Sequence, residues 1–224
     1  MRILNIREAP GVPGASGLDA VTLVDHGMLG MVHFRLGSGE EIGEHVMPLE
    51  VIFLVLEGDG VLTVDQEEVS ADCGTALRCP AGTPRAWKNP GPDTLRVLVL
   101  KLKTSTETGD EHMDIRRIEE QPAADNAHGV DVRRAYESEH ALASVITLEP
   151  GQALKRHITP VDVFFYVLEG SGTVEVGEES MTVSRDTVID SPKDVPHCWR
   201  NDSGDRLRVL VVKVPKPTKG TKLL

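Results

Sequence analysis

The amino-acid sequence repeats itself once, without a gap, at an offset of 112 residues in a chain of 224. The segment HVMPLEVIFLVLEGDG begins at His45, and its counterpart HITPVDVFFYVLEGSG begins at His157. The same offset aligns LRVLVLK with LRVLVVK near the end of each copy. A fixed internal period means that one structural unit is present twice. The repeat therefore predicts two domains, residues 1–112 and 113–224.

Each copy is predicted to consist of β-strands. VIFLVLEG, LRVLVLK and their counterparts are short, rich in β-branched and aromatic residues, and bounded by Gly, Pro, Asp or Asn. They recur at close spacing, and no long amphipathic helical pattern separates them. This pattern favours an all-β fold, with a sandwich or barrel in each half. The polar segment 103–111 is the predicted linker.

Charge and composition exclude several classes of partner. The formal net charge of −11 argues against nucleic acid, which requires a surface rich in Lys and Arg. No apolar run is long enough to cross a membrane, and the first ten residues carry three charges where a signal peptide needs an apolar stretch. Three cysteines do not make a disulfide framework. We therefore expect a cytoplasmic protein with no nucleic-acid or membrane partner. Cys73 and Cys79 could form a disulfide if their strands met, but two buried, reduced thiols are the favoured expectation.

Two motifs in each copy resemble those of the cupin superfamily. The first family motif is a Gly, then His-x-His, a Glu and a strand ending in Gly; the second is Pro-x-Gly-x-x-His-x-x-x-Asn. The second copy has His157 and His197 in two of the three His positions and Thr159 in the third. The resemblance implies that each copy is a jelly-roll barrel, a double-stranded β-helix. The whole chain would then be a bicupin, with two cupin barrels in tandem.

In the family, a metal is usually held by both His of the first motif, its Glu, and the His of the second. The Glu position falls on Val51 and Val163, with an acid one residue earlier at Glu50 and Asp162. Neighbouring residues of a strand point to opposite faces, so this slip normally directs a side chain out of the barrel. A proline in each preceding turn could shift the phase. The sequence leaves open whether these acids face the interior.

The resemblance implies a candidate metal site in the second copy. His157, His197 and Asp162 would hold one divalent metal, Fe, Mn, Zn or Ni, if Asp162 faces inward. The alternative is a relict pair of histidines in a barrel that has lost its metal.

The first copy is not expected to hold metal. It keeps His45 but has Met47 and Arg85 in the other His positions, and a protonated Arg cannot ligate a metal. If Glu50 and Arg85 both face inward, they would form a buried ion pair. Otherwise Arg85 would reach the barrel mouth, where its guanidinium could receive a carboxylate.

Aromatic residues share strand faces with these positions. Trp87 and Trp199 follow the second-motif His position by two residues, and Phe165 follows the Glu position by two. They would either line a ligand pocket or fill a small barrel. The candidate ligand-binding residues are therefore Trp199, Phe165, Arg85, Trp87, His45 and Glu50. The histidines outside the motifs are expected to be ordinary surface or edge residues: His26, His33, His112, His128 and His140.

Apolar residues occupy both faces of the central strand in each copy, for example Ile52 and Leu54, then Phe164 and Tyr166. The outer face should then be covered, either by the other copy or by a second chain in a homodimer. The predicted function is binding of a small polar or carboxylated metabolite, through a divalent metal in the C-terminal barrel. The alternative is a metal-free binding, sensing or structural bicupin.

Overall fold

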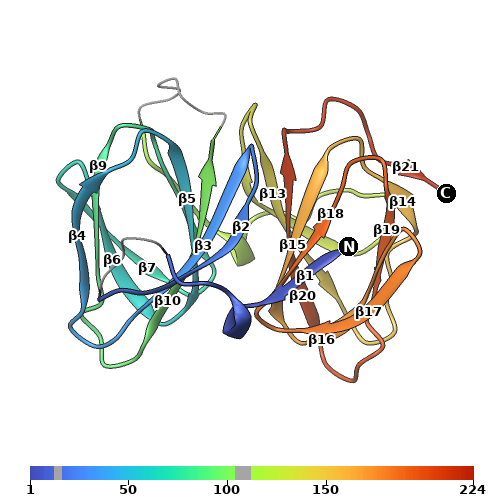
Figure 1. Cartoon of the computed structure of the whole chain (residues 1–224), viewed down its shortest axis with the longest axis horizontal. Helices are drawn as coiled ribbons and strands as arrows, with labels where there is room; N and C mark the ends of the chain where they lie inside the picture. The colour runs from blue at the N-terminus through green and yellow to red at the C-terminus, as the bar shows by residue number, and fades with distance from the viewer. Residues whose placement is uncertain (13–16, 104–111) are drawn as a thin grey trace. The chain divides into compact units, whose positions relative to one another are not determined.

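The protein is described by a computed structural model that covers residues 1–12, 17–103 and 112–224 (Figure 1). The chain divides into two compact units. We call Ala9–Glu120 the first barrel, and Met1–Glu8 together with Gln121–Leu224 the second barrel. Of the predicted linker 103–111, all but Lys103 lies outside the described residues. No helix in the described residues is long and apolar enough to cross a membrane.

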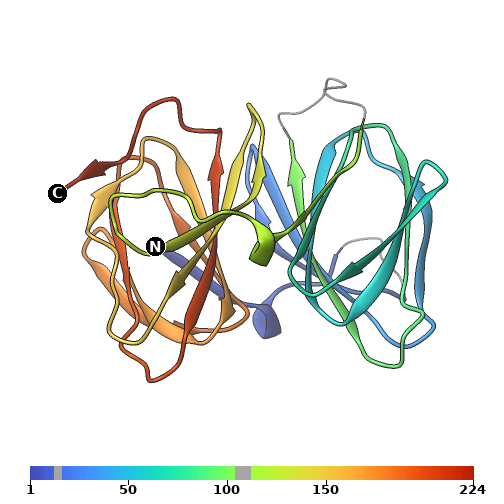
Figure 2. The same cartoon turned by 180° about the vertical axis from the view of Figure 1, so that it is seen from behind.

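The first barrel is built from antiparallel strands in two curved sheets (Figures 1 and 2). In the described residues, one sheet has the order β11-β8-β5-β10-β3-β2 and the other β4-β9-β6-β7. The strands are β2 (Asp19–Asp25), β3 (Leu29–Leu36), β4 (Glu41–Val46), β5 (Glu50–Glu57), β6 (Asp59–Val64), β7 (Glu67–Asp72), β8 (Thr75–Cys79), β9 (Pro84–Lys88), β10 (Leu95–Leu102) and β11 (Asp114–Arg117). The short 3-10 helix η2 (Ile118–Glu120) follows.

The second barrel has the same architecture. Within the described residues its sheets have the orders β1-β18-β15-β20-β13-β12 and β17-β16-β19-β14-β21. The strands are β1 (Arg2–Asn5), β12 (Asp131–Glu137), β13 (Leu142–Leu148), β14 (His157–Ile158), β15 (Asp162–Glu169), β16 (Ser171–Val176), β17 (Glu179–Ser184), β18 (Thr187–Ser191), β19 (Pro196–Arg200), β20 (Leu207–Val214) and β21 (Lys222–Leu223). The 3-10 helix η1 (Ile6–Glu8) follows β1. The expected all-β fold with one barrel in each copy is thus confirmed.

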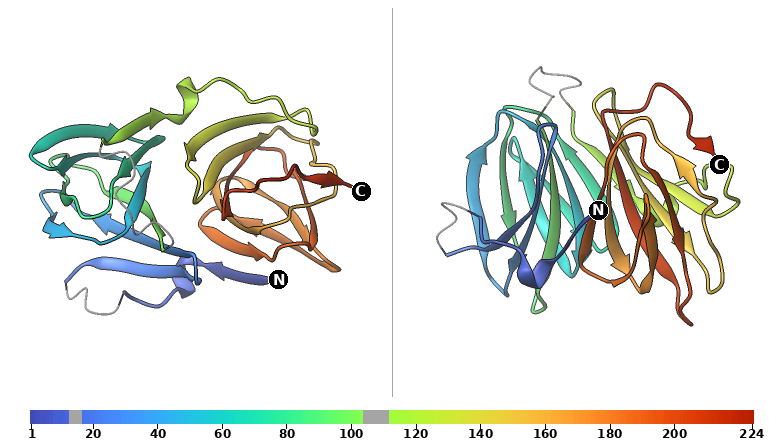
Figure 3. Two further views of the ribbon diagram at one scale, coloured as in Figure 1. Left: turned by 90° about the horizontal axis from the view of Figure 1, so that it is seen from above. Right: turned by 45° about the vertical axis from the view of Figure 1, so that its right-hand side comes forward.

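The first strand of each copy belongs to the barrel of the other copy. Strand β1 pairs with β18, and the dark blue N-terminal strand lies beside the orange strands of the second barrel in Figure 3. Strand β11, which begins 112 residues after β1, pairs with β8 of the first barrel. The compact units therefore differ from the sequence repeats 1–112 and 113–224 by an exchange of one strand and one 3-10 turn.

Side chains alternate between two buried faces along the central strands. In β15, Val163 and Phe165 belong to the core inside the second barrel, together with Trp199 and Leu207. Residues of the other face, such as Tyr166, are also buried. The apolar residues on this outer face are thus buried, as their sequence pattern predicted.

Gly170, at the end of β15, has a conformation that other residues adopt only at a cost. Its φ is +76°, and an added Cβ would overlap the carbonyl oxygen of Arg206. A left-handed non-glycine residue costs about 1–3 kcal/mol, and the overlap adds to this. We expect Gly170→Ala to lower the free energy of unfolding by at least about 2 kcal/mol in urea titrations. Gly204→Ala, where an added Cβ meets only open space, should change it little.

Candidate functional site

The second barrel contains a cavity of about 340 Å³. Residues from several strands and from the loop before β12 line it, so its wall is built by the barrel fold itself. Apolar side chains, among them Leu142, Ile146, Phe165 and Val211, form much of the wall. The polar groups on the wall are mainly basic: His128, His157, His197, Lys213 and Arg134. The acidic residue that lines it, Asp125, is exposed.

Antiparallel pairing of β14 with β19 places His157 directly opposite His197. Their ring centroids lie 4.4 Å apart, and the His197 ring meets Phe165 edge-on at 5.4 Å. The Nδ1–H of His157 donates to the carbonyl oxygen of Lys155 at 2.8 Å, which leaves Nε2 as an acceptor in the neutral ring. Burial lowers the pKa of His157.

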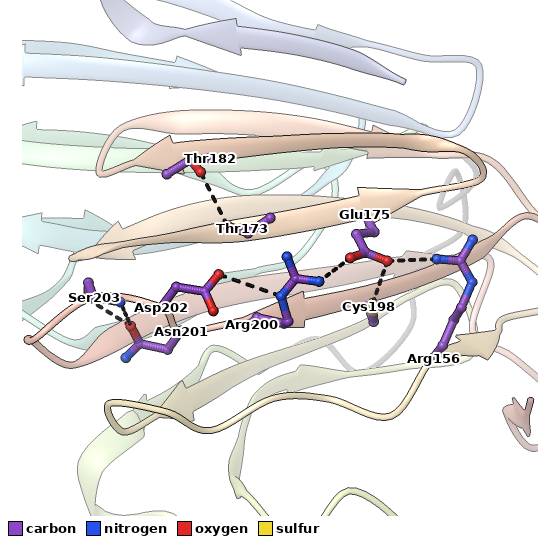
Figure 4. A network of polar contacts seen from close by, with 9 residues as sticks. All are labelled: Arg156, Thr173, Glu175, Thr182, Cys198, Arg200, Asn201, Asp202 and Ser203. Carbon is purple, nitrogen blue, oxygen red and sulfur yellow. Dashed lines mark hydrogen bonds and ion pairs between the residues drawn. The ribbon is translucent and has the colours of Figure 1, made fainter.

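The residue before His157 is anchored on the outside of the barrel (Figure 4). The Arg156 guanidinium donates to Glu175 Oε2 at 2.8 Å and to the carbonyl oxygen of Gly177. Glu175 also pairs with Arg200 and accepts a hydrogen bond from the Cys198 thiol. Because neighbouring strand residues point to opposite faces, an outward Arg156 directs His157 inward.

His197 is held by two hydroxyl groups inside the barrel. Its Nδ1 lies 2.9 Å from Ser191 Oγ, and its Nε2 lies 3.4 Å from Thr159 Oγ1. Burial, with a smaller contribution from His157, lowers the pKa of His197 to about 3. The imidazole is therefore neutral at physiological pH.

His128 was expected to be an ordinary surface or edge histidine, and this expectation is wrong. It is half-buried, lines the cavity, and lies 4.6 Å from His157 between ring centroids. Its Nδ1 accepts the backbone N–H of Lys155 at 3.2 Å, so in the neutral ring the proton is on Nε2. Burial, followed by the nearby His157 and Lys213, lowers its pKa to about 4. His33 is also buried, and its Nε2 accepts a hydrogen bond from Arg96.

Lys213 was not anticipated as a site residue. It lies in β20 directly opposite Val163 in β15, and it lines the cavity. No hydrogen-bond or ion-pair partner is found for its amine within residues 1–12, 17–103 and 112–224. Burial lowers its pKa, and its charge in turn contributes to the lowered pKa values of all three cavity histidines.

Asp162 is not brought together with the two histidines. It precedes the interior residue Val163 in β15 and therefore points to the opposite face. Its carboxylate accepts the backbone N–H of Lys193 at 2.9 Å and does not line the cavity.

The candidate residues of the first barrel are separated in the same way. Glu50 precedes the interior residue Val51, and its Oε2 accepts hydrogen bonds from Arg78 Nε and Nη2, both at 2.7 Å. The predicted Glu50–Arg85 ion pair is therefore not formed, because Glu50 points away from the barrel interior whereas Arg85 points into it.

Arg85 is inside the first barrel and does not reach its mouth, contrary to the other expectation. It is 1% exposed and donates to the carbonyl oxygens of Thr83 and Pro80. Its Nη1 has no partner in the described structure, and burial lowers its pKa. His45 lies opposite Arg85 in the β4–β9 pair, and its Nδ1 lies 3.0 Å from the Gly43 carbonyl oxygen.

The two tryptophans fill the barrels. Trp87 and Trp199 are each 1% exposed, and neither indole N–H has a partner among the described residues. Trp199 packs edge-on against Phe165 at 5.6 Å but does not line the cavity, whereas Phe165 does. Trp87 packs similarly against Phe53 at 5.5 Å.

All three cysteines are thiols rather than disulfides, but Cys73 is exposed, whereas a buried thiol was predicted there. Burial raises the pKa of Cys79 to about 11, and burial and Glu175 raise that of Cys198. Since the thiolate is the reactive form, buried thiols of raised pKa react slowly. We expect a thiol reagent to modify Cys73 alone in the native protein and all three cysteines in denaturant. Rapid labelling of Cys198 in the native protein would contradict this placement.

The residues around His157 and His197 do not fit a divalent metal. A metal enzyme site needs about three protein ligands, and the second His position holds Thr159 while the Glu position holds Val163. The amine of Lys213, opposite Val163, adds positive charge where a cation would have to bind. Across the described part of the chain, no three His, Cys, Asp or Glu side chains could together hold a metal ion.

The chain has two tandem barrels, and each barrel consists of two antiparallel sheets. Each barrel also carries a motif histidine, or the residue that replaces it, in its interior. These features define a class of two-domain β-barrel proteins. The cupin domain matches residues 32–101 and again residues 144–213. The chain belongs to the cupin family, and its two domains make it a bicupin.

Solved structures show the same fold at low sequence identity. A cupin 2 conserved barrel domain protein from Leptotrichia buccalis is 16% identical, with a TM-score of 0.69 over 95% of this chain and 96% of that one. Oxalate decarboxylase from Bacillus subtilis is 14% identical, with a TM-score of 0.80 over 100% and 79%. AerE from Microcystis aeruginosa is 11% identical, with a TM-score of 0.80 over 93% and 97%. No match was found among curated proteins.

Proposed function

We propose that the second barrel binds a small carboxylated metabolite without a metal, with the Lys213 ammonium group as the main source of attraction. The environment of the Lys213 amine is the observation that supports the proposal. The amine lines a cavity that also holds three neutral histidines, and no acidic side chain within the described residues pairs with it. An ammonium group that is partly removed from water and unpaired is stabilised by a bound anion.

The other polar groups on the cavity wall support a ligand that also carries a hydroxyl or carbonyl oxygen. The Nε2–H of His128 can donate a hydrogen bond, and the Nε2 of His157 can accept one. The apolar wall, which includes Phe165 and Val211, would cover the carbon skeleton. A small carboxylate with an oxygen on its second carbon suits all three types of contact.

A divalent metal remains the competing hypothesis because the related fold can hold one. A structure of the oxalate decarboxylase from Bacillus subtilis concerns its Mn(II) centres. At 14% identity this likeness shows the fold alone, and the residues of the present site lack the ligands described above. The alternative function, a structural bicupin with its interior packed shut, is disfavoured by the cavity in the second barrel.

Calorimetric titration with pyruvate and lactate tests the proposal. Lys213→Met should weaken binding at least about tenfold, because removing one member of a close charge pair typically costs more than 1.4 kcal/mol. Lys101→Met is the matched control, since Lys101 occupies the same strand position in the first barrel, and it should bind like the wild type. Equal binding by wild type and Lys213→Met would contradict the proposal.

Elemental analysis of protein purified without chelators tests the metal hypothesis separately. We expect no stoichiometric Fe, Mn, Zn or Ni. About one equivalent per chain, lost in a His157→Ala/His197→Ala variant, would replace the metal-free interpretation with a metal site.

A further inference from the structure

The backbone of Lys155 fixes His128 and His157 in opposite tautomers. Its N–H donates to Nδ1 of His128 at 3.2 Å, and its carbonyl oxygen accepts from Nδ1–H of His157 at 2.8 Å. In the neutral rings, Nε2 of His128 then carries a proton, whereas Nε2 of His157 carries a lone pair. The backbone of one residue thus gives the cavity a neutral hydrogen-bond donor and a base side by side.

These two rings are placed to act on one ligand. Their centroids lie 4.6 Å apart, and both line the cavity together with the amine of Lys213, which has no partner among the described residues. Removal of a proton from the carbon next to a carbonyl group requires a base, together with groups that stabilise negative charge on the oxygen. The cavity, which is partly apolar, supplies a base, a neutral hydrogen-bond donor and a cation. The base takes the proton, while the donor and the cation stabilise the negative charge that develops on oxygen.

We propose that the second barrel catalyses proton transfer at the carbon next to the carbonyl of a small 2-oxo acid, with His157 as the base. This inference rests on the proposed function, because it assumes that a small carboxylate occupies the cavity. His128 and Lys213 serve as the groups that hold the carbonyl oxygen.

The step balances without a cofactor. The proton on the carbon moves to Nε2 of His157, the C–H electron pair forms the new C=C bond, and the carbonyl π pair moves to oxygen. The enolate oxygen accepts hydrogen bonds from the Lys213 ammonium and from Nε2–H of His128, which stays neutral. The His157 imidazolium then returns a proton to carbon. In D₂O it first exchanges with solvent, so the net change is deuterium for hydrogen at that carbon.

The lowered pKa values of the two histidines agree with these roles. Burial keeps both rings uncharged at neutral pH, so His157 is available as a base and His128 as a neutral donor. His197 is a less suitable base because both of its ring nitrogens lie near hydroxyl groups, those of Ser191 and Thr159.

Deuterium uptake at C3 of pyruvate, 2-oxobutyrate and phenylpyruvate, followed by proton NMR in D₂O, tests the inference. Wild-type protein should exchange at least one of them well above the buffer rate. His157→Gln should lower the enzymatic rate roughly 100-fold or more, the usual contribution of a general base, while calorimetry shows that the acid still binds. His140→Gln, a histidine of the same barrel that does not line the cavity, should exchange like the wild type.

The outcomes separate this inference from the proposed function. Binding of an oxo acid without exchange above the buffer rate would overturn the inference and leave the binding proposal intact. Exchange that is equally fast in His157→Gln would also overturn it, because another group would then be the base. Failure of every carboxylate to bind would overturn both.

Discussion

A Thr159→His/Val163→Glu/Lys213→Leu variant should bind about one Mn²⁺ per chain, with His157 and His197 completing the ligand set. Thr159 is buried with its hydroxyl 3.4 Å from His197 Nε2, and Val163 faces the barrel interior. The first two substitutions restore the family positions that this chain has lost, and the third removes the amine that opposes a cation. Three or four nitrogen and oxygen ligands with an open position suit a divalent metal. Elemental analysis after dialysis and the Mn(II) spin-resonance spectrum measure the result.

The control variant moves the acid by one residue. Thr159→His/Asp162→Glu/Lys213→Leu carries its glutamate on the opposite strand face, where Asp162 now accepts the Lys193 N–H. It should bind Mn²⁺ no better than a Thr159→His/Lys213→Leu variant that has no added acid. If this control binds one equivalent, the acid reaches the interior, and our assignment of strand faces is wrong.

The second barrel should lose stability as the pH falls from 6.5 towards 4. The histidine pKa is 6.5 in the unfolded chain, but about 3 for His197 and about 4 for His128 in the folded protein. In this window the unfolded chain binds more protons than the folded one, so the free energy of unfolding falls as the pH falls. Between pH 6.5 and pH 4.5, His197 contributes a loss on the order of 2–3 kcal/mol.

Urea titrations at several pH values measure this dependence. His197→Gln should be less stable than the wild type at pH 7.5, because it loses packing against Phe165 and its contact with Ser191. Its stability should nevertheless depend less steeply on pH, by roughly 1 kcal/mol per pH unit across the window. Parallel curves for variant and wild type would show that His197 is not buried as a neutral ring.

The fold could be predicted from sequence because the repeat and the strand pattern are consistent with each other. Two gap-free copies, each with short apolar strands bounded by turn residues, indicated two β-barrels, and the cupin motifs specified their type. The exchange of β1 and β11 left no such signal. The residue pattern of each first strand is equally compatible with pairing in the barrel of its own copy and in the barrel of the other copy. Only the path of the chain determines which of the two pairings forms.

The site was only partly predictable. His157 and His197 were found from the motif, but the position of Asp162 depended on the phase of β15, which the preceding proline left open. His128 lies in an irregular loop, and the corresponding residue of the first copy is Ser16, so the repeat offered no counterpart. Lys213 could have been found, because it continues the two-residue spacing of the interior residues of β20.

The exchanged strands bear on how such a chain could arise. A single copy with this topology would leave one edge of β8, in the first copy, or of β18, in the second, unpaired. Its own first strand would be available to pair with another chain. Two separate copies would therefore complete each other only as a reciprocally swapped pair. Joining them end to end would preserve every strand pairing while freeing each half to change independently. The divergence of Arg85 and His197 at one motif position is the kind of difference that identical subunits could not have accumulated.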